Sequence, residues 1–149
     1  MESWDRQSLQ EEQKRDPDIS FVYERIMSGA DKPSWDEVSA KSRDTKTLCS
    51  FWPRLSVKDG ILVRRFEAEN SLDSHYQVIL PKAPSEQFLK LVHTGVVGHL
   101  GFKKSSAAVQ ARAYWPTWAS DLASYLKRCK ECAQYHRGAL KRRAEMQIS

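Results

Sequence analysis

Apolar positions recur with a helical period over most of the chain and with a strand period over one short stretch. Residues 1–16 are polar, which predicts either a frayed end or a loose first helix. The segment that follows carries Ile19, Val22 and Ile26 at helical spacing. We therefore expect a helix there, with Asp18 as its N-cap.

Two shorter helices are predicted next. Ser34 and Glu37 have the spacing of a capping box, in which each side chain binds an exposed N–H group of the other residue. A third helix is expected over residues 45–52, and Pro53 would end it because proline disfavours helical backbone before it. The N-terminal part of the chain is therefore predicted to be helical.

The period then changes to that of strands. Two apolar runs, residues 55–57 and 61–63, flank the sequence Lys58-Asp59-Gly60. Asp-Gly between apolar runs favours a type I′ hairpin, whose two central residues need positive φ. With a third strand over residues 76–80, we expect a small antiparallel sheet within residues 55–80.

Helical spacing returns after Pro81. We expect helices over residues 84–93 and 103–113, with Phe102 and Val109 on the apolar side of the second. A further helix starts near Trp118. Its apolar face continues to Cys129, and the members of that face recur at i, i+4, i+7 and i+11: Trp118, Leu122, Tyr125 and Cys129.

Composition limits the class of protein. In the 149 residues no apolar run approaches the roughly 20 residues that a membrane span needs. The start of the sequence lacks the apolar core of a signal peptide, so we expect the nucleus and cytoplasm as its compartments and no membrane partner. Three cysteines, an odd number, argue against a disulfide framework and favour a metal site for the close pair.

Charge is divided unevenly along the chain. Residues 1–50 carry 8 Lys/Arg and 11 Asp/Glu, a net charge of −3, and residues 51–149 carry 16 and 8, a net charge of +8. A basic segment suits a partner that carries phosphates, although a solvated surface explains the same charge. Charge alone leaves these two interpretations open.

Four metal-ligand residues occur in the basic part, in the order His93-x5-His99-x29-Cys129-x2-Cys132. Structural zinc takes four nitrogen or sulfur ligands in a tetrahedron, and Cys-x2-Cys presents two thiolates from one short segment. The helical pattern puts Cys129 on an inward face, where it can meet the histidines. We therefore predict one structural Zn²⁺ bound by these four residues.

Each ligand also has a simpler interpretation. The cysteine pair alone is compatible with a redox motif, and either histidine alone with a structural role. His136 lies four residues after Cys132 and competes with the two histidines as a ligand. Cys49, beside apolar residues, is better explained as a small buried hydrophobe, and His75 needs no special role.

Zinc should matter for folding. The segment of residues 82–137 has few core residues, and domains of that size commonly need a metal. Zinc supplies roughly 10–16 kcal/mol of apparent binding free energy in such modules. We therefore expect the three helices of this segment to lose fixed packing on chelation.

These residues resemble a known family. The stretch of residues 91–138 is similar to the His-His-Cys-Cys zinc-binding domain of integrases from gypsy-type LTR retrotransposons and retroviruses. Its hallmarks here are His93, Gly98-His99, Gly101, Lys103-Lys104, Tyr114-Trp115-Pro116 and Cys129-x2-Cys132. The segments at 16–18, 35–39 and 57–65 resemble the sequence that leads into such integrases. Ala113 departs from the family, which usually has a larger residue there, and this predicts weaker packing at that position.

The resemblance implies a division into parts. Residues 1–80 correspond to an N-terminal extension domain, 81–137 to the zinc-binding domain, and 138–149 to a basic linker toward a catalytic core. That core would hold two Asp and one Glu, and it does not fit after Cys132. We therefore expect a non-catalytic fragment whose parent protein is an integrase, a polynucleotidyl transferase. The expected fold class is α+β and mainly helical, with a helical extension, a small antiparallel sheet and a three-helix zinc-binding bundle arranged like a helix-turn-helix.

Two functions follow from the resemblance and the composition. The first is a module that helps integrase subunits to form a homo-oligomer and contacts the retroelement-end DNA. The basic residues that we expect near phosphates are Lys103, Lys104, Arg112, Lys127, Arg128, Lys130, Arg137, Lys141, Arg142 and Arg143. The alternative is a host-domesticated integrase remnant that binds host proteins, for which exposed Trp4, Trp35 and Trp52 would be suited.

Overall fold

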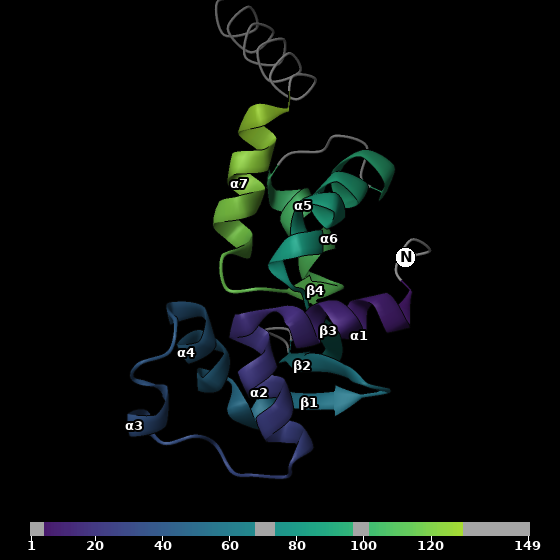
Figure 1. Ribbon diagram of the computed structural model, residues 1–149. Coiled ribbons are helices and arrows are strands. Elements are labelled where there is room, and N and C mark those ends of the chain that lie inside the picture. The colour runs from purple at the N-terminus through teal and green to yellow at the C-terminus, as the bar shows by residue number, and fades with distance from the viewer. Residues whose placement is uncertain (1–4, 68–73, 97–101, 130–149) are drawn as a thin grey trace, which may run out of the picture. The chain divides into compact units, whose positions relative to one another are not determined.

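The computed structural model describes residues 5–67, 74–96 and 102–129 (Figure 1). The chain divides into two compact units, which are described separately below. Unit 1 takes Met1–Ser85 and Gln110–Pro116, and unit 2 takes Glu86–Val109 and Thr117–Ser149. The combination of helices with a small sheet confirms the predicted α+β class. The predicted boundary at residues 80 and 81 lies within unit 1, and the division into domains stays a prediction.

Four helices and a 3₁₀ turn precede the sheet in unit 1. Their bounds are α1 Arg6–Arg15, α2 Pro17–Met27, α3 Trp35–Val38, α4 Arg43–Ser50 and η1 Trp52–Arg54. Helix α1 decides between the two interpretations of the polar N-terminal stretch, because residues 6–15 are helical with Leu9 and Gln13 buried. The helix predicted over residues 45–52 begins and ends two residues earlier, since Trp52 opens η1.

Local capping explains where these helices begin. The predicted cap of α2 was wrong: Asp16, not Asp18, accepts hydrogen bonds at Oδ1 from the N–H groups of Asp18 and Ile19. Pro17 occupies the first helical position, so α2 begins two residues earlier than a cap at Asp18 would place it. The capping box before α3 is confirmed, because the Ser34 N–H donates to Glu37 Oε2 at 2.8 Å and the Glu37 N–H donates to Ser34 Oγ at 3.4 Å.

The β1–β2 hairpin is confirmed as predicted. Strands β1 (Leu55–Lys58), β2 (Ile61–Glu67) and β3 (Ser74–Ile79) pair antiparallel in that order. Asp59 and Gly60 have φ of +53° and +82°, as a type I′ turn requires. Helices α1 and α2 pack against this hairpin (Figure 1).

The sheet is mixed, which corrects the prediction of an antiparallel one. A fourth strand, β4 (Ala113–Tyr114), pairs with β3 in parallel. The Val78 N–H donates to the Arg112 carbonyl and the Leu80 N–H donates to the Tyr114 carbonyl, both at 2.9 Å. Ala113 is therefore a strand residue rather than the end of a helix. It is 1% exposed and lies opposite Val78, where a short side chain is well packed.

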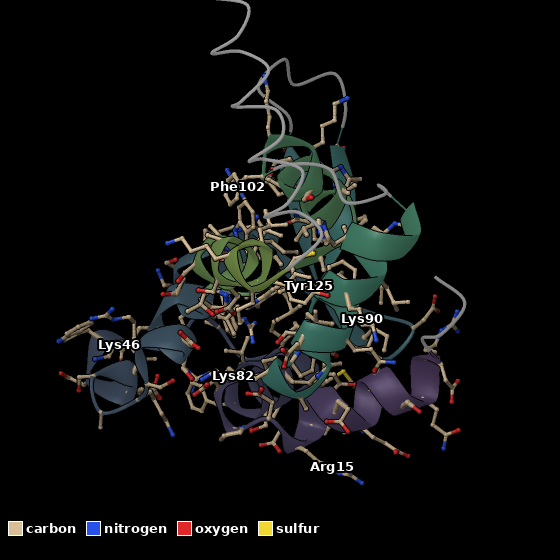
Figure 2. The ribbon with its side chains drawn as sticks, turned by 90° about the horizontal axis from the view of Figure 1, so that it is seen from above. Arg15, Lys46, Lys82, Lys90, Phe102 and Tyr125 are labelled. Atoms are coloured by element: carbon tan, nitrogen blue, oxygen red, sulfur yellow. The ribbon has the colours of Figure 1, made fainter. Side chains whose placement is uncertain are left out.

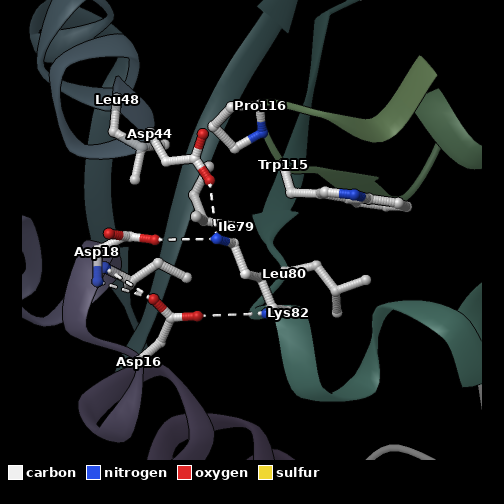
Figure 3. A pocket seen from close by; sticks show the side chains of 10 residues that line it. Asp16, Asp18, Asp44, Leu48, Ile79, Leu80, Lys82, Trp115 and Pro116 are labelled. Carbon is white, nitrogen blue, oxygen red and sulfur yellow. Dashed lines mark hydrogen bonds and ion pairs between the residues drawn. The ribbon is translucent and has the colours of Figure 1, made fainter. Parts of the chain in front are cut away.

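Lys82, the first residue of α5 (Lys82–Lys90), forms a hydrogen bond and ion pairs with carboxylates of unit 1 (Figure 3). The Lys82 N–H donates to Asp16 Oδ2 at 3.3 Å, and Lys82 Nζ lies 3.4 Å from both Asp18 Oδ2 and Asp44 Oδ2. The carboxylates of Asp44 and Asp18 raise the pKa of Lys82 above its ordinary value. This ion-pair cluster fixes the first turn of α5 in unit 1.

The described residues of unit 2 form helical segments and their connections. Helix α5 continues into a π-helical turn, η2 (Leu91–Val96), and α6 (Phe102–Gln110) and α7 (Trp118–Arg128) follow. Among its residues that the structure describes, few apolar ones are buried: Phe88, Leu89, Val92, Val109 and Leu122. Phe102, expected on an apolar face, is 45% exposed (Figure 2). Within the described ranges, every helix is too short or too polar to cross a bilayer.

Candidate metal centre

His93 lies on the buried stripe that runs along α5 into η2. Phe88 and Val92 are four residues apart, as are Leu89 and His93, and all four side chains are at most 2% exposed. Hydrophobic neighbours on one helical face thus bring the imidazole inside unit 2. A π-helical turn is rare and frequently occurs at functional sites, and this one contains His93.

Helix α7 brings Cys129 toward the same part of unit 2. The rings of His93 and Tyr125 meet edge to face, with centroids 5.8 Å apart and planes at 81°. Tyr125 precedes Cys129 by four residues, a rise of about 6 Å along a helix. Cys129 is the C-cap of α7, with a near-helical φ of −77° and an extended ψ of 112°. The predicted ligands His93 and Cys129 are therefore borne by neighbouring elements.

The chemistry of these two donors fits zinc. Imidazole nitrogen and thiolate sulfur are the ligands that Zn²⁺ takes in structural sites. The other two predicted ligands, His99 and Cys132, lie outside the described residues, as does the competing His136. Among the residues described, no group of three or more His, Cys, Asp or Glu side chains converges as a metal site. The four-ligand set accordingly stays a prediction.

The remaining cysteine and histidine have structural roles in unit 1. Cys49 is 3% exposed in α4, and burial raises the pKa of its thiol. This confirms the interpretation of Cys49 as a small buried hydrophobe. His75 lies within β3, where its Nε2 is 3.1 Å from the Gln110 carbonyl oxygen and its ring packs on Phe66.

The predicted phosphate-contacting cations fall into three groups. Lys103, Lys104 and Lys127 are exposed in unit 2, and Arg112 is exposed in unit 1. Arg128 is also exposed, but its Nη1 lies 3.3 Å from Glu86 Oε1, so it is already in an ion pair. The other predicted cations lie outside the described residues: Lys130, Arg137, Lys141, Arg142 and Arg143.

Gln13 is a structural residue that the sequence interpretation missed. The paired register of β2 and β3 begins at Val63 and Val78, and Gln13 takes the place of the next pair. Its Nε2 donates to the carbonyl oxygens of Leu62 and Ile79 at 3.0 and 2.8 Å, and its Oε1 accepts from the Leu62 N–H at 2.8 Å. The sequence feature that could have indicated a buried Gln13 is its position four residues after the apolar Leu9, on the same face of a helix.

Arg64 is the second residue that was missed, and it explains the family hallmark Tyr114. The guanidinium lies 3.8 Å from the centroid of the Tyr114 ring and 4.6 Å from that of Phe51. Its Nε donates to Gln77 Oε1 at 3.0 Å, and burial lowers the pKa of Arg64. Strand alternation from Leu62 could have placed Arg64 on the inner face. Tyr114 therefore has a structural role in unit 1, where its ring packs against the Arg64 guanidinium.

Residues 80–137 match the family described as the integrase zinc binding domain. No curated protein matches the chain significantly. The match covers less than half of the chain, and it supports a resemblance of this part to the N-terminal region of retroviral and retrotransposon integrases. It implies that this segment binds zinc, and a domain of this kind is itself non-catalytic.

Proposed function

We propose that the chain is the zinc-binding module of a retrotransposon integrase of the gypsy type. One structural Zn²⁺ is held by His93, His99, Cys129 and Cys132. The module supports integrase multimerisation and contacts the element-end DNA during integration. The match of residues 80–137 to the integrase zinc binding domain carries this proposal.

The placement of His93 and Cys129 adds support from physical chemistry. A buried imidazole and a helix-capping thiol on neighbouring segments need only the Gly98-His99 and Cys132 segments to complete a tetrahedral donor set. The small core gives zinc a stabilising role, because the five buried apolar residues in the described part of unit 2 are few for an independent fold. We propose residues 1–80 as an N-terminal extension to this module and residues 138–149 as a linker.

Matched variants test the ligand set. His99→Ala and Cys129→Ser should each lower the zinc content of the purified chain well below one ion, measured by elemental analysis. His136→Ala and Cys49→Ser are the controls and should retain one ion per chain. Retention of zinc by His99→Ala together with its loss in His136→Ala would assign the fourth ligand to His136 instead.

DNA contact is tested by the salt dependence of binding to a short labelled duplex. Replacement of Lys103 and Lys104 by Gln should lower the slope of log K against log salt by about 1–2, since each phosphate contact adds about 0.9. The control, Lys32→Gln with Arg43→Gln, removes two exposed charges from unit 1 and should leave the slope unchanged. Equal slopes for both double variants would contradict a DNA contact by these lysines.

The second candidate function is that of a host-domesticated remnant that binds proteins. Trp35 favours it, because this large apolar side chain is 69% exposed in unit 1, whereas Trp52 is partly buried and Trp4 lies outside the described residues. Light scattering with and without zinc separates the candidates. A zinc-dependent homo-oligomer with salt-sensitive DNA binding supports the integrase module, and a chain that binds no DNA supports the remnant. We expect neither form to catalyse strand transfer.

A further inference from the structure

Tyr125 lies on α7 (Figure 2). Its ring contacts the buried imidazole of His93. Edge-to-face pairs are favoured when ring centroids are about 4.5–7 Å apart, and the pair of His93 and Tyr125 has 5.8 Å and 81°. Such a contact restricts rotation of the imidazole plane, since a rotated ring would lose the edge-to-face geometry. The aromatic face of α7 therefore sets how the imidazole is presented.

The same ring is itself held from a second direction. The guanidinium of Arg128 lies 5.8 Å from the Tyr125 centroid, and Arg128 Nε donates to the Ser124 carbonyl at 3.4 Å. Arg128 Nη1 also pairs with Glu86 on α5 at 3.3 Å. This ion pair is exposed and therefore weak, but it joins α5 with α7 beside the Tyr125 ring.

From these contacts we infer that Tyr125 is a positioning residue for the zinc site, one that orients the His93 imidazole toward the end of α7 that bears Cys129. The inference rests on the proposed function, which makes His93 and Cys129 ligands. Hydrogen-bonding groups around a ligating histidine fix its ring orientation, and their loss typically costs 10–100-fold in metal affinity. A packed aromatic ring restrains the imidazole plane in the same sense, so we expect an effect at the lower end of that range. The contact needs the ring of Tyr125, not its hydroxyl.

Cobalt binding to the full chain tests this role. Co²⁺ replaces zinc in tetrahedral sites, its visible bands report the geometry of the sulfur and nitrogen ligands, and competition with a chelator gives the Zn²⁺ affinity. Tyr125→Leu should weaken Zn²⁺ binding on the order of 10-fold and shift the cobalt bands. Tyr125→Phe should match the wild type in both measurements. Tyr76→Leu, at a 49% exposed tyrosine of β3 in unit 1, is the control and should also match.

The outcomes separate this inference from the proposed function. If the wild type takes up neither zinc nor cobalt, the proposed function fails. If it binds both and Tyr125→Leu binds with the same affinity and spectrum, only the inference fails. Equal weakening by Tyr125→Phe would also overturn it, because the hydroxyl would then be responsible. If Tyr125→Leu does not regain the wild-type circular dichroism in saturating zinc, Tyr125→Met takes its place. The same affinity and spectral results then support or overturn the inference.

Discussion

Units 1 and 2 differ in the kinds of side chain that fill their buried interiors. Unit 1 has a four-stranded sheet and a sizeable buried apolar core that includes Val22, Leu62 and Ile79, and its buried polar side chains Gln13 and Arg64 have hydrogen-bond partners in the same unit. In unit 2, the residues that the structure describes form helical segments with few buried apolar side chains and a fully buried histidine. We therefore expect the apolar core and internal hydrogen bonds to hold unit 1 together, and we expect unit 2 to depend on the metal that we propose it binds.

Removal of the metal should have the largest effect and should be confined to unit 2. Chelation takes away a contribution of roughly 10–16 kcal/mol in modules of this kind. We expect hydrogen exchange to become fast in α6 and α7 while the amides of β2 and β3 stay protected. Equal loss of protection in the sheet would contradict the independence of unit 1, and unchanged protection of α7 would contradict the role of the metal.

Gln13→Met should be the most damaging single change in unit 1. It leaves the Leu62 N–H and two carbonyl groups without their buried partner, at a cost of about 3 kcal/mol or more in the free energy of unfolding. Urea denaturation measures this loss of stability, followed by the fluorescence of Trp52, just before β1, and Trp115, just after β4. Gln7→Met, at an exposed position of the same helix, should change stability by less than about 0.5 kcal/mol. Similar losses for both variants would refute the bridging role.

Arg64→Met should cost unit 1 about 2–3 kcal/mol. The change removes the cation stacked on Tyr114 and leaves Gln77 Oε1 without the Arg64 donor. The neighbouring Arg65→Met is the control, because Arg65 is exposed and forms a surface ion pair with Glu67 at 2.9 Å. A stability loss in Arg65→Met that equals the loss in Arg64→Met would argue against a special role of the buried guanidinium.

Lys82→Met should have the smallest effect, at most about 1 kcal/mol, because the side chain is 67% exposed and its ion pairs are screened. Its pKa is raised by Asp44 and Asp18 above the ordinary 10.5, so the stabilisation is complete below that pH and is lost as pH rises through the folded-state pKa. Thermal melts at neutral and strongly alkaline pH measure this difference. Lys32→Met, at an exposed lysine elsewhere in unit 1, should show no such pH dependence.

The features that could be predicted from sequence are those encoded within a few residues. The Asp59-Gly60 hairpin and the Ser34–Glu37 capping box depend on local backbone chemistry, and both are confirmed. Strand β4 could not be predicted, because it is two residues long and is a strand only through β3, more than thirty residues earlier in the chain. Gln13 and Arg64 likewise have their roles through distant partners.

The candidate metal site likewise has features that the sequence predicts and features that it does not. The spacing of His93, His99, Cys129 and Cys132 is sufficient to predict zinc ligands. Two histidines and a Cys-x2-Cys pair in this order are typical of a zinc site, whereas each residue alone is also compatible with a structural role. The aromatic contact from Tyr125 was not predictable, since periodicity alone assigns Tyr125 to a core face without naming its neighbour. Nor did sequence spacing show that Arg128, nominated for phosphate contact, pairs with Glu86.

X-ray absorption at the zinc edge of the purified full chain measures which atoms surround the metal. We expect one zinc per chain with two sulfur ligands at about 2.3 Å and two nitrogen ligands at about 2.0–2.1 Å. A chain without bound zinc, or a metal surrounded by oxygen ligands only, would contradict it.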